Sequence, residues 1–300
     1  MPADTPCTRI LMLHRVLDDA PVAFGLPGCY RMRGTALTLA ELVRVVDETG
    51  PIVSLEAVER SLARGDEPPA GSVLTFDDGY REHLDLVAPL MAARRVSATF
   101  YVATGLHGAC SDVAVVDAWY WLLDHAEARI ARIPLPNGGE LHGRIDTLEG
   151  KRAWVAGEPK AALLAATSAH QAVMLAALAE SAGRELPDDL AAQLYLRRED
   201  WSALVGLGMR VGAHSVRHPR LTQVDDRTLR AEVAASVAAL RGLGAPVAFA
   251  YPDGAHDERV VDEVRRPQVS SAVTCEPGVV TRGADLMRLP RVFVVGGAAQ

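Results

Sequence analysis

Two adjacent carboxylates, Asp77 and Asp78, stand where an apolar segment stops and a glycine turn begins, in the run LTFDDGY at residues 74–80. In parallel α/β folds the active site lies at the carboxyl ends of the strands, so these side chains occupy a position suited to chemistry. An isolated Asp-Asp-Gly sequence is also a common solvated turn. A second feature is therefore needed before a catalytic role is assigned.

Two histidines, His214 and His218, provide that feature, because His214 directly follows the apolar segment 209–213 and His218 comes four residues later. Imidazoles separated by three residues can face one cation when the backbone turns, and a carboxylate then completes a three-ligand site with positions left for water and substrate. Alone, such a pair also occurs as surface or capping chemistry. Both motifs together, each at a strand end, favour a metal site.

The two motifs resemble those of a known family. TFDDG at 75–79 and HSxxHP at 214–219 are similar to the first two motifs of the polysaccharide deacetylases, also called the NodB-homology family or carbohydrate esterase family four. The resemblance extends from about residue 10 to residue 295, apart from an insertion.

This resemblance implies a role for each of the four residues. Asp77 is expected to be the general base, and Asp78, His214 and His218 are expected to bind a divalent metal. The expected metal is Zn²⁺, with Co²⁺ or another divalent ion as the alternative. A metal with open positions can polarise an amide carbonyl and acidify water to a pKa of about 7, which agrees with that chemistry.

A third segment, FAYPDG at 249–254, resembles the family's third motif, whose backbone N–H stabilises the oxyanion. The corresponding donor here is Asp253. Many members carry Arg at the position of Ala250 and Tyr at that of Asp253, so the arginine that normally orients the base is missing. A purely structural Pro-Asp-Gly turn is the alternative.

The general acid of the family is usually a histidine in a Leu-x-x-His motif near the C-terminus, and no histidine follows His256 here. The N-terminal LMLH at 11–14 matches that pattern, as in circularly permuted deacetylases that act on poly-N-acetylglucosamine. The resemblance therefore implies His14 as the general acid. A histidine buried in the core is the alternative.

Arg291, in LPRV at 289–292, is the candidate to replace the missing arginine. A buried guanidinium near Asp77 would keep that carboxylate ionised. A surface arginine at the end of a strand is the alternative.

Three aromatic residues, Tyr80, Tyr251 and Trp119, are the candidates for substrate binding, because aromatic faces pack against pyranose rings. Asp117 and Tyr120 lie beside Trp119 at the start of the insertion. For Trp119 and Tyr120 a role in the core is the alternative.

Short apolar runs alternate with helical patterns such as 38–49, 81–94 and 225–243, which predicts an α/β fold. We expect a distorted (β/α) barrel of about seven parallel strands, with an open sheet as the alternative. Residues 1–300 would form one catalytic domain with a helical insertion at about 111–199, around a turn at 136–139. The predicted strands are 10–13, 73–76, 98–102, 209–213, 247–250, 271–274 and 292–295.

Composition excludes several classes. The 300 residues are 49% hydrophobic and 23% charged with a net charge of −7, which suits a globular protein and gives no basic surface for nucleic acid. The four cysteines form no Cys-x-x-Cys pair. Residues 1–9 lack the layout of a signal peptide and no run reaches the length of a membrane span, so we expect a cytoplasmic protein.

The predicted activity is removal of the N-acetyl group from an amino sugar, carried by a glycan precursor, an oligosaccharide or a sugar-bearing metabolite. Two alternatives stay open, because one scaffold hosts many substrates. They are an amidohydrolase acting on a non-sugar amide and a catalytically inactive carbohydrate-binding homologue.

Overall fold

The computed structural model describes residues 7–17, 22–107 and 113–296. Two compact units divide the chain, and we describe each by itself. The barrel unit comprises Met1–Val16, Leu39–Asp112 and Ala191–Val294, and the helical unit comprises Leu17–Thr38, Val113–Leu190 and Val295–Gln300. Cys110 lies outside the described residues.

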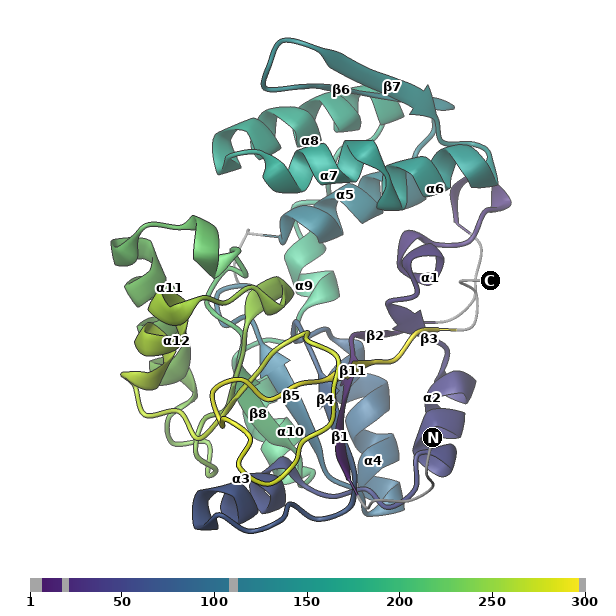
Figure 1. The fold of residues 1–300 in the computed structure, drawn as a ribbon. Helices are drawn as coiled ribbons and strands as arrows, with labels where there is room; N and C mark the ends of the chain where they lie inside the picture. Colours follow the sequence, from purple (N-terminus) through teal and green to yellow (C-terminus); the bar gives the residue numbers. More distant parts are fainter. Residues whose placement is uncertain (1–6, 18–21, 108–112, 297–300) are drawn as a thin grey trace. The chain divides into compact units, whose positions relative to one another are not determined.

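The barrel unit is built on a seven-stranded sheet in the order β10-β9-β8-β5-β4-β1-β11, and all neighbours pair in parallel (Figure 1). The predicted α/β fold with about seven parallel strands is confirmed. The strands are β1 (Thr8–Leu13), β4 (Gly71–Phe76), β5 (Ala98–Val102), β8 (Arg210–Ala213), β9 (Phe249–Ala250), β10 (Ala272–Val273) and β11 (Val292–Phe293).

The two edges of this sheet are joined by one short segment. Leu289 forms a parallel bridge with Val273 of β10, and three residues later Val292 pairs with Leu11 of β1. The sheet therefore curls into a distorted barrel, and the residues between these two pairings cross the gap between its edges.

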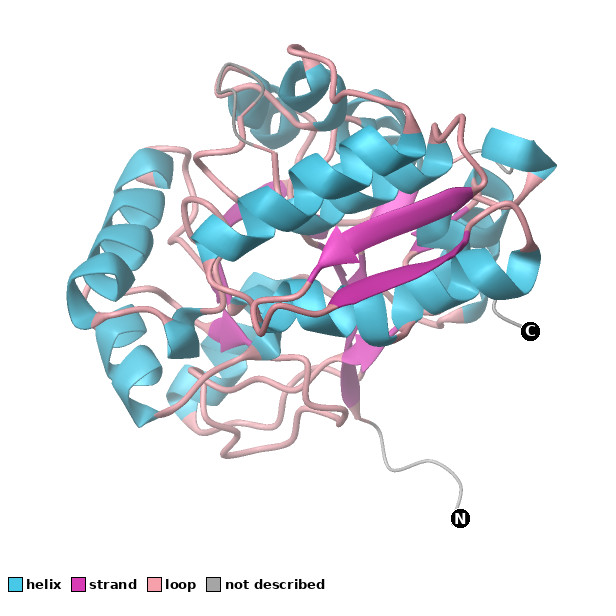
Figure 2. Cartoon of the chain, turned by 90° about the horizontal axis from the view of Figure 1, so that it is seen from above, coloured by secondary structure: helices cyan, strands magenta, loops and turns pink. Residues whose placement is uncertain are grey.

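Helices around the strands explain the apolar composition of the sheet (Figure 2). Every residue of β5 and β8 is buried, as expected for parallel strands covered on both faces. Helices α3, α11 and α12 begin at side-chain caps, provided by Ser54, Asp225 and Asp257. The helices are α2 (Leu39–Glu48), α3 (Leu55–Arg64), α4 (Ala88–Arg94), α10 (Asp200–Gly206), α11 (Asp226–Leu240) and α12 (Glu258–Arg265), with α9 (Leu190–Leu194) at the unit boundary.

The helix predicted over 81–94 has two parts. A π-helical turn, η2 (His83–Val87), precedes α4, which carries a proline in its first turn. Pro89 has no N–H to donate, so an uninterrupted α-helical ladder cannot run through this position.

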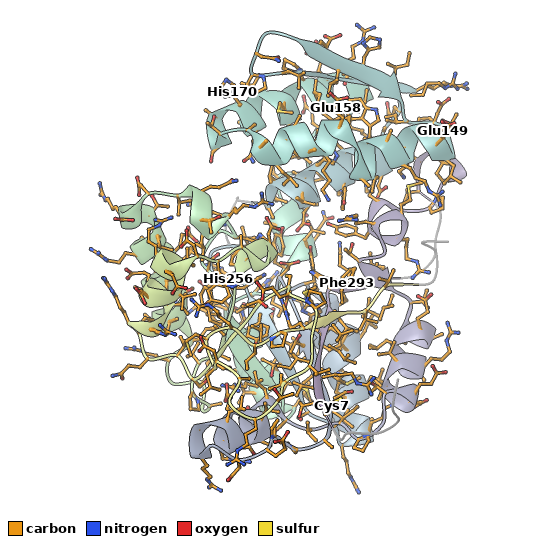
Figure 3. All side chains as sticks on the ribbon, viewed as in Figure 1. Cys7, Glu149, Glu158, His170, His256 and Phe293 are labelled. Carbon is orange, nitrogen blue, oxygen red and sulfur yellow. The ribbon has the colours of Figure 1, made fainter. Side chains whose placement is uncertain are left out.

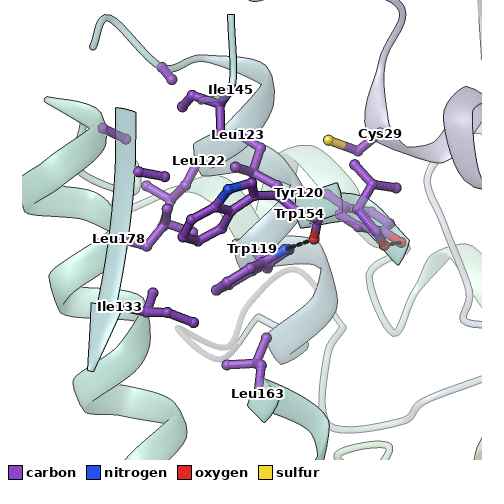
Figure 4. Close-up of a cluster of buried hydrophobic side chains, with 14 of the residues drawn as sticks. Cys29, Trp119, Tyr120, Leu122, Leu123, Ile133, Ile145, Trp154, Leu163 and Leu178 are labelled. Atoms are coloured by element: carbon purple, nitrogen blue, oxygen red, sulfur yellow. Dashed lines mark hydrogen bonds between the residues drawn. The ribbon is translucent and has the colours of Figure 1, made fainter. Parts of the chain in front are cut away.

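The helical unit contains a β-hairpin that the sequence did not predict. The predicted turn at 136–139 connects β6 (Ile130–Pro134) to β7 (Glu140–Arg144), which pair antiparallel. Trp119 and Trp154 stack in the core of the unit, with ring centroids 5.5 Å apart (Figure 4). The helices are α1 (Cys29–Arg33), α5 (Val115–Asp124), α6 (Leu148–Ala156), α7 (Glu158–Ala165) and α8 (Ser168–Ala182).

The remaining elements are short: β2 (Arg15–Val16), β3 (Ala36–Leu37), η1 (Ala23–Gly25), η3 (Leu221–Gln223) and η4 (Pro252–Gly254). Among the helices of the described ranges, none combines the length and the apolar character that crossing a bilayer requires.

Candidate metal centre and active site

The end of β4 places the two carboxylates. The N–H of Asp77 donates to the Leu13 carbonyl, the last hydrogen bond between β4 and β1, and the chain then turns through two residues with positive φ, Asp78 (78°) and Gly79 (77°). A Cβ on Gly79 would lie 3.0 Å from Val102, so this turn requires glycine. The turn directs two successive carboxylates to the same edge of the barrel.

The end of β8 places the two imidazoles by similar means. The His214 N–H donates to the Val102 carbonyl, and the Ser215 hydroxyl accepts the N–H of His218 at 2.9 Å. Ser215 and His218 both have positive φ, at 62° and 58°. Glu232 of α11 accepts the backbone N–H groups of Val216 and Arg217, at 2.8 and 2.9 Å, which fixes the loop that carries His218.

Backbone strain gathers at this edge. Asp78, Ser215, His218 and Asp253 are four of the seven non-glycine residues with positive φ in the described ranges. Such conformations cost of order 1–3 kcal/mol each and persist where the surrounding structure imposes them. Their concentration around a few polar side chains indicates a site shaped for function.

Three ligand atoms converge here. Asp78 Oδ1 lies 3.5 Å from Nε2 of His214 and 3.5 Å from Nε2 of His218, and the two Nε2 atoms are 3.1 Å apart. With Zn–N bonds of about 2.0–2.1 Å, ligand atoms of a tetrahedral site lie about 3.3 Å apart, so the spacing fits one small divalent ion. Asp78 and His218 keep 19% and 22% of their side chains exposed, so solvent reaches the three atoms.

Hydrogen bonds prepare the ligands for a cation. His214 Nδ1 lies 2.7 Å from the Ala250 carbonyl, which can only accept, so Nδ1 carries a proton and Nε2 is the nitrogen available to a metal. Burial opposes ionisation of Asp78, but its hydrogen bond to His214 and the charge of His218 hold the pKa of Asp78 far below its ordinary value. The carboxylate is therefore ionised, as a metal ligand must be.

Asp77 is held by Arg291 and not by the imidazoles. Two guanidinium nitrogens donate to its two carboxylate oxygens, at 2.8 and 2.7 Å, and the two residues are only 2% and 1% exposed. Burial alone would raise the pKa of Asp77, but the charge and hydrogen bonds of Arg291 hold it below the ordinary value. Arg291 lies in the segment that joins the two edges of the barrel, and this position directs its side chain to the end of β4.

His14 follows the last residue of β1 and belongs to the same electrostatic environment. Burial is the main influence and lowers the pKa of His14, while the nearby charges of Asp78 and Asp77 partly oppose this shift. Its Nδ1 is buried and has no hydrogen-bond partner among the described residues. The Phe293 ring, labelled in Figure 3, stands edge-on to the imidazole, with centroids 5.7 Å apart.

The third motif forms the short turn η4. Asp253 has a φ of 54°, and its exposed carboxylate pairs with Arg220 at 3.3 Å. Gly254 donates its N–H to the Tyr251 carbonyl, which closes the turn. The oxyanion role of the Asp253 N–H stays a prediction.

The structure places the three aromatic candidates in packing positions. Tyr80 is 3% exposed and stacks on Tyr195, and Tyr251 is fully buried with its hydroxyl donating to the Met287 carbonyl. Trp119 lies in the core of the helical unit, where its indole N–H donates to the Trp154 carbonyl. No ring face of the three is exposed, so these contacts do not support their assignment to substrate binding.

Two residues near His14 were missed in the sequence. Phe293 is 37% exposed at the end of β11, and His83 is fully buried on η2 with its Nε2 2.8 Å from the His14 carbonyl. An aromatic residue in the predicted strand 292–295, two positions after Arg291, was a signal that could have found Phe293. His83 gave no such signal, because its contact depends on the π-helical turn.

The fold and the cluster together define an α/β-barrel enzyme with a carboxylate and imidazole centre at the carboxyl ends of its strands. The profile of the polysaccharide deacetylase family matches residues 64–120 and 175–271, which is just over half of the chain. The chain belongs to the polysaccharide deacetylase family, and the expected membership is confirmed.

Solved structures share this fold. The *Streptococcus pyogenes* deacetylase PplD in complex with acetate is 18% identical, with a TM-score of 0.57 over 97% of this chain and 94% of that one. The BpsB deacetylase domain from *Bordetella bronchiseptica* is 18% identical, with a TM-score of 0.57 over 99% and 98%. IcaB from *Ammonifex degensii* is 17% identical, with a TM-score of 0.54 over 97% and 92%. No curated protein sequence matches the chain.

Proposed function

We propose that this chain is a metal-dependent hydrolase that removes the N-acetyl group of an amino sugar. Membership of the polysaccharide deacetylase family supports deacetylation of an acetylated sugar. The observation that carries the metal dependence is the convergence of Asp78, His214 and His218, whose ligand atoms all lie within 4.8 Å of one another.

These three residues would hold the metal. One carboxylate oxygen and two imidazole nitrogens suit Zn²⁺ and also Co²⁺, and they leave positions for water and substrate. When bound, the ion supplies Lewis acidity, which polarises the amide carbonyl and acidifies water.

Asp77 is the proposed general base, which takes the proton of the attacking water. Arg291 keeps the carboxylate ionised and occupies one lone-pair position on each oxygen. A carboxylate has about four such positions, so each oxygen can still accept a proton. The rigid pairing also limits rotation of the carboxylate.

His14 is the proposed general acid, and the Asp253 N–H is the proposed oxyanion donor. After water adds to the carbonyl carbon, the C–N bond breaks and the imidazolium of His14 delivers its proton to the departing nitrogen. The products are acetate and the free amino sugar. The location of His14 beside the charges of Asp77 and Asp78 supports this division of roles.

An acetate-release assay on metal-stripped and reconstituted protein tests the proposal. Substrates should include N-acetylated monosaccharides, oligosaccharides and nucleotide-linked sugars, with acetylated non-sugar amines as the comparison. We expect release from a sugar that is lost on chelation and restored by Zn²⁺ or Co²⁺. Release that survives complete metal removal would contradict the metal role, release from the non-sugar amines alone would favour the amidohydrolase alternative, and bound sugar without acetate release would favour the inactive homologue.

A further inference from the structure

His83 holds the backbone of His14 at the point where strand pairing ends. The register of β1 and β4 runs to Leu13 and Phe76, and the Asp77 N–H still reaches the Leu13 carbonyl. Beyond this point Asp78 turns away with positive φ. The His14 carbonyl instead receives the Nε2–H of His83, at 2.8 Å.

The direction of this hydrogen bond is fixed. A carbonyl oxygen can only accept, so Nε2 of His83 carries the proton. Burial lowers the pKa of His83, which keeps the ring neutral with a bare Nδ1. Nδ1 is buried and has no hydrogen-bond partner among the described residues, so the ring makes one directed polar contact, and that contact is to His14.

The surroundings of His83 hold the ring in place. It is fully buried, and its centroid lies 5.6 Å from that of Phe76, 5.8 Å from Tyr80 and 5.3 Å from Phe100. The His83 N–H donates to the Tyr80 carbonyl, which ties η2 to the end of the LTFDDGY motif. π-Helical turns of this kind are frequent at functional sites.

A second contact joins Arg15, the residue after His14, to Glu82, the residue before His83. Both carboxylate oxygens of Glu82 accept from Arg15, at 2.7 and 3.1 Å, and both side chains are buried. The Arg15 guanidinium also lies over the Tyr80 ring, 4.3 Å from its centroid. Two neighbouring residues after β1, His14 and Arg15, are therefore each held by a hydrogen bond from or to one of two neighbouring residues, His83 and Glu82.

We propose that His83 is a positioning residue. By its hydrogen bond to the His14 carbonyl, it holds the imidazole of His14 in the orientation needed to protonate the leaving amine. This inference rests on the proposed function, in which His14 is the general acid. His83 touches neither the ligand triad nor Asp77 in the contacts described, so its hydrogen bond to the His14 carbonyl is the polar contact by which its side chain can act on the proposed site.

Matched substitutions test the hydrogen bond. His83→Phe preserves an aromatic ring among Phe76 and Phe100 but removes the donor, and should lower kcat by about 10–100-fold, the range expected for a small misplacement of a catalytic group. KM and metal content should stay unchanged. His83→Gln, whose amide reaches the position of Nε2, should recover most of the turnover, whereas His83→Asn, which reaches only the position of Nδ1, should not.

A double-mutant cycle separates positioning from loss of stability. In a His14→Ala background, His83→Phe should cause no further fall in kcat, because the group that it positions is already gone. Fully additive losses, or wild-type turnover in folded His83→Phe, would overturn the inference. Should His83→Phe fail to fold, equal activity of His83→Gln and His83→Asn would overturn it as well.

An NMR measurement does not depend on the substrate. In protein with labelled histidine, His83→Phe should shift and broaden the ring signals of His14 and leave those of His214 and His218 unchanged. If the signals change in this way but the unsubstituted protein releases no acetate from any substrate, the contact between His83 and His14 is supported and the proposed function is refuted. Unchanged His14 signals in an active variant would refute the contact alone.

Discussion

Two buried ion pairs between a carboxylate and an arginine stand at opposite ends of the barrel. At the carboxyl ends of the strands, Asp77 pairs with Arg291, and at the amino ends, Glu59 pairs with Arg210 at 2.9 Å. All four residues are at most 8% exposed. Similar chemistry therefore occurs both beside the ligand triad and far from it.

The other partners distinguish the two pairs. Glu59 also accepts from the hydroxyls of Ser270 and Ser271, which do not ionise in the physiological range. Asp77 instead lies in the field of His214 and His14, whose imidazoles can change their protonation state. A buried ion pair thus indicates function only through the groups around it.

The largest expected effect separates the two ends. Asp77→Asn should lower turnover by about 10²–10⁴-fold, the usual range for a lost acid or base, while the metal stays bound. Glu59→Gln is the matched control, because each change removes the carboxylate nearest to a buried arginine. The loss of folding stability should reach about 3–5 kcal/mol for Asp77→Asn and be smaller for Glu59→Gln, since Arg210 keeps Glu56 at 3.4 Å. Turnover measured well below each melting temperature should fall only for Asp77→Asn, and an equal fall in both variants would refute the distinction.

The second prediction concerns proton donation. His14→Ala should retain metal and lower turnover by about 10²–10³-fold, because solvent is a poorer donor to the departing amine. Only protonated His14 is active as an acid, so kcat/KM should fall as pH rises through its pKa. Since burial lowers that pKa, the fall should begin at a lower pH than for an exposed histidine. The variant should lack this alkaline limb in a pH-rate profile, and a limb that persists would assign it to another group.

The third prediction concerns the metal. His214→Ala or His218→Ala should weaken Zn²⁺ binding by at least about tenfold, since even partners of metal ligands contribute about 10–100-fold. Titration with a competing chelator measures the affinity. His83→Phe, a change in another buried histidine, should leave affinity unchanged, and full occupancy in both ligand variants would refute the assigned centre.

These features differ in how far the sequence predicted them. Asp77 and His214 directly follow apolar strands, with Asp78 and His218 one and four residues later. All four could be named because the carboxyl ends of parallel strands share one edge. The pairing of Asp77 with Arg291 joins residues 214 positions apart, so only the closed barrel reveals its geometry. The β6–β7 hairpin was missed because its strands are short and mostly exposed at alternate positions, which gives a weak pattern.

Aromatic residues show the limit most clearly. Tyr80 and Tyr251 stand in chemical motifs, yet each ring packs inward, because neighbouring residues of a turn or strand point in different directions. The exposed ring near His14 belongs to Phe293, which stands in no recognised motif. Proximity to a motif in sequence therefore predicts the location of an aromatic residue better than the direction of its ring.

The smallest expected effect tests whether Phe293 serves the substrate. Aromatic contacts contribute about 0.5–1.5 kcal/mol beyond simple burial, so Phe293→Ala should raise KM about 2–10-fold and leave kcat almost unchanged. Phe293→Leu keeps the apolar character without the flat face, so it should raise KM nearly as much if a sugar ring packs there. Val279→Ala is the control, since Val279 is 44% exposed and precedes Val280, which bridges the first residue of β1 at the opposite end of the barrel. A fall in kcat with constant KM would instead show that the Phe293 ring acts on His14, which it meets edge-on, and would place this residue with His83 among the supports of the general acid.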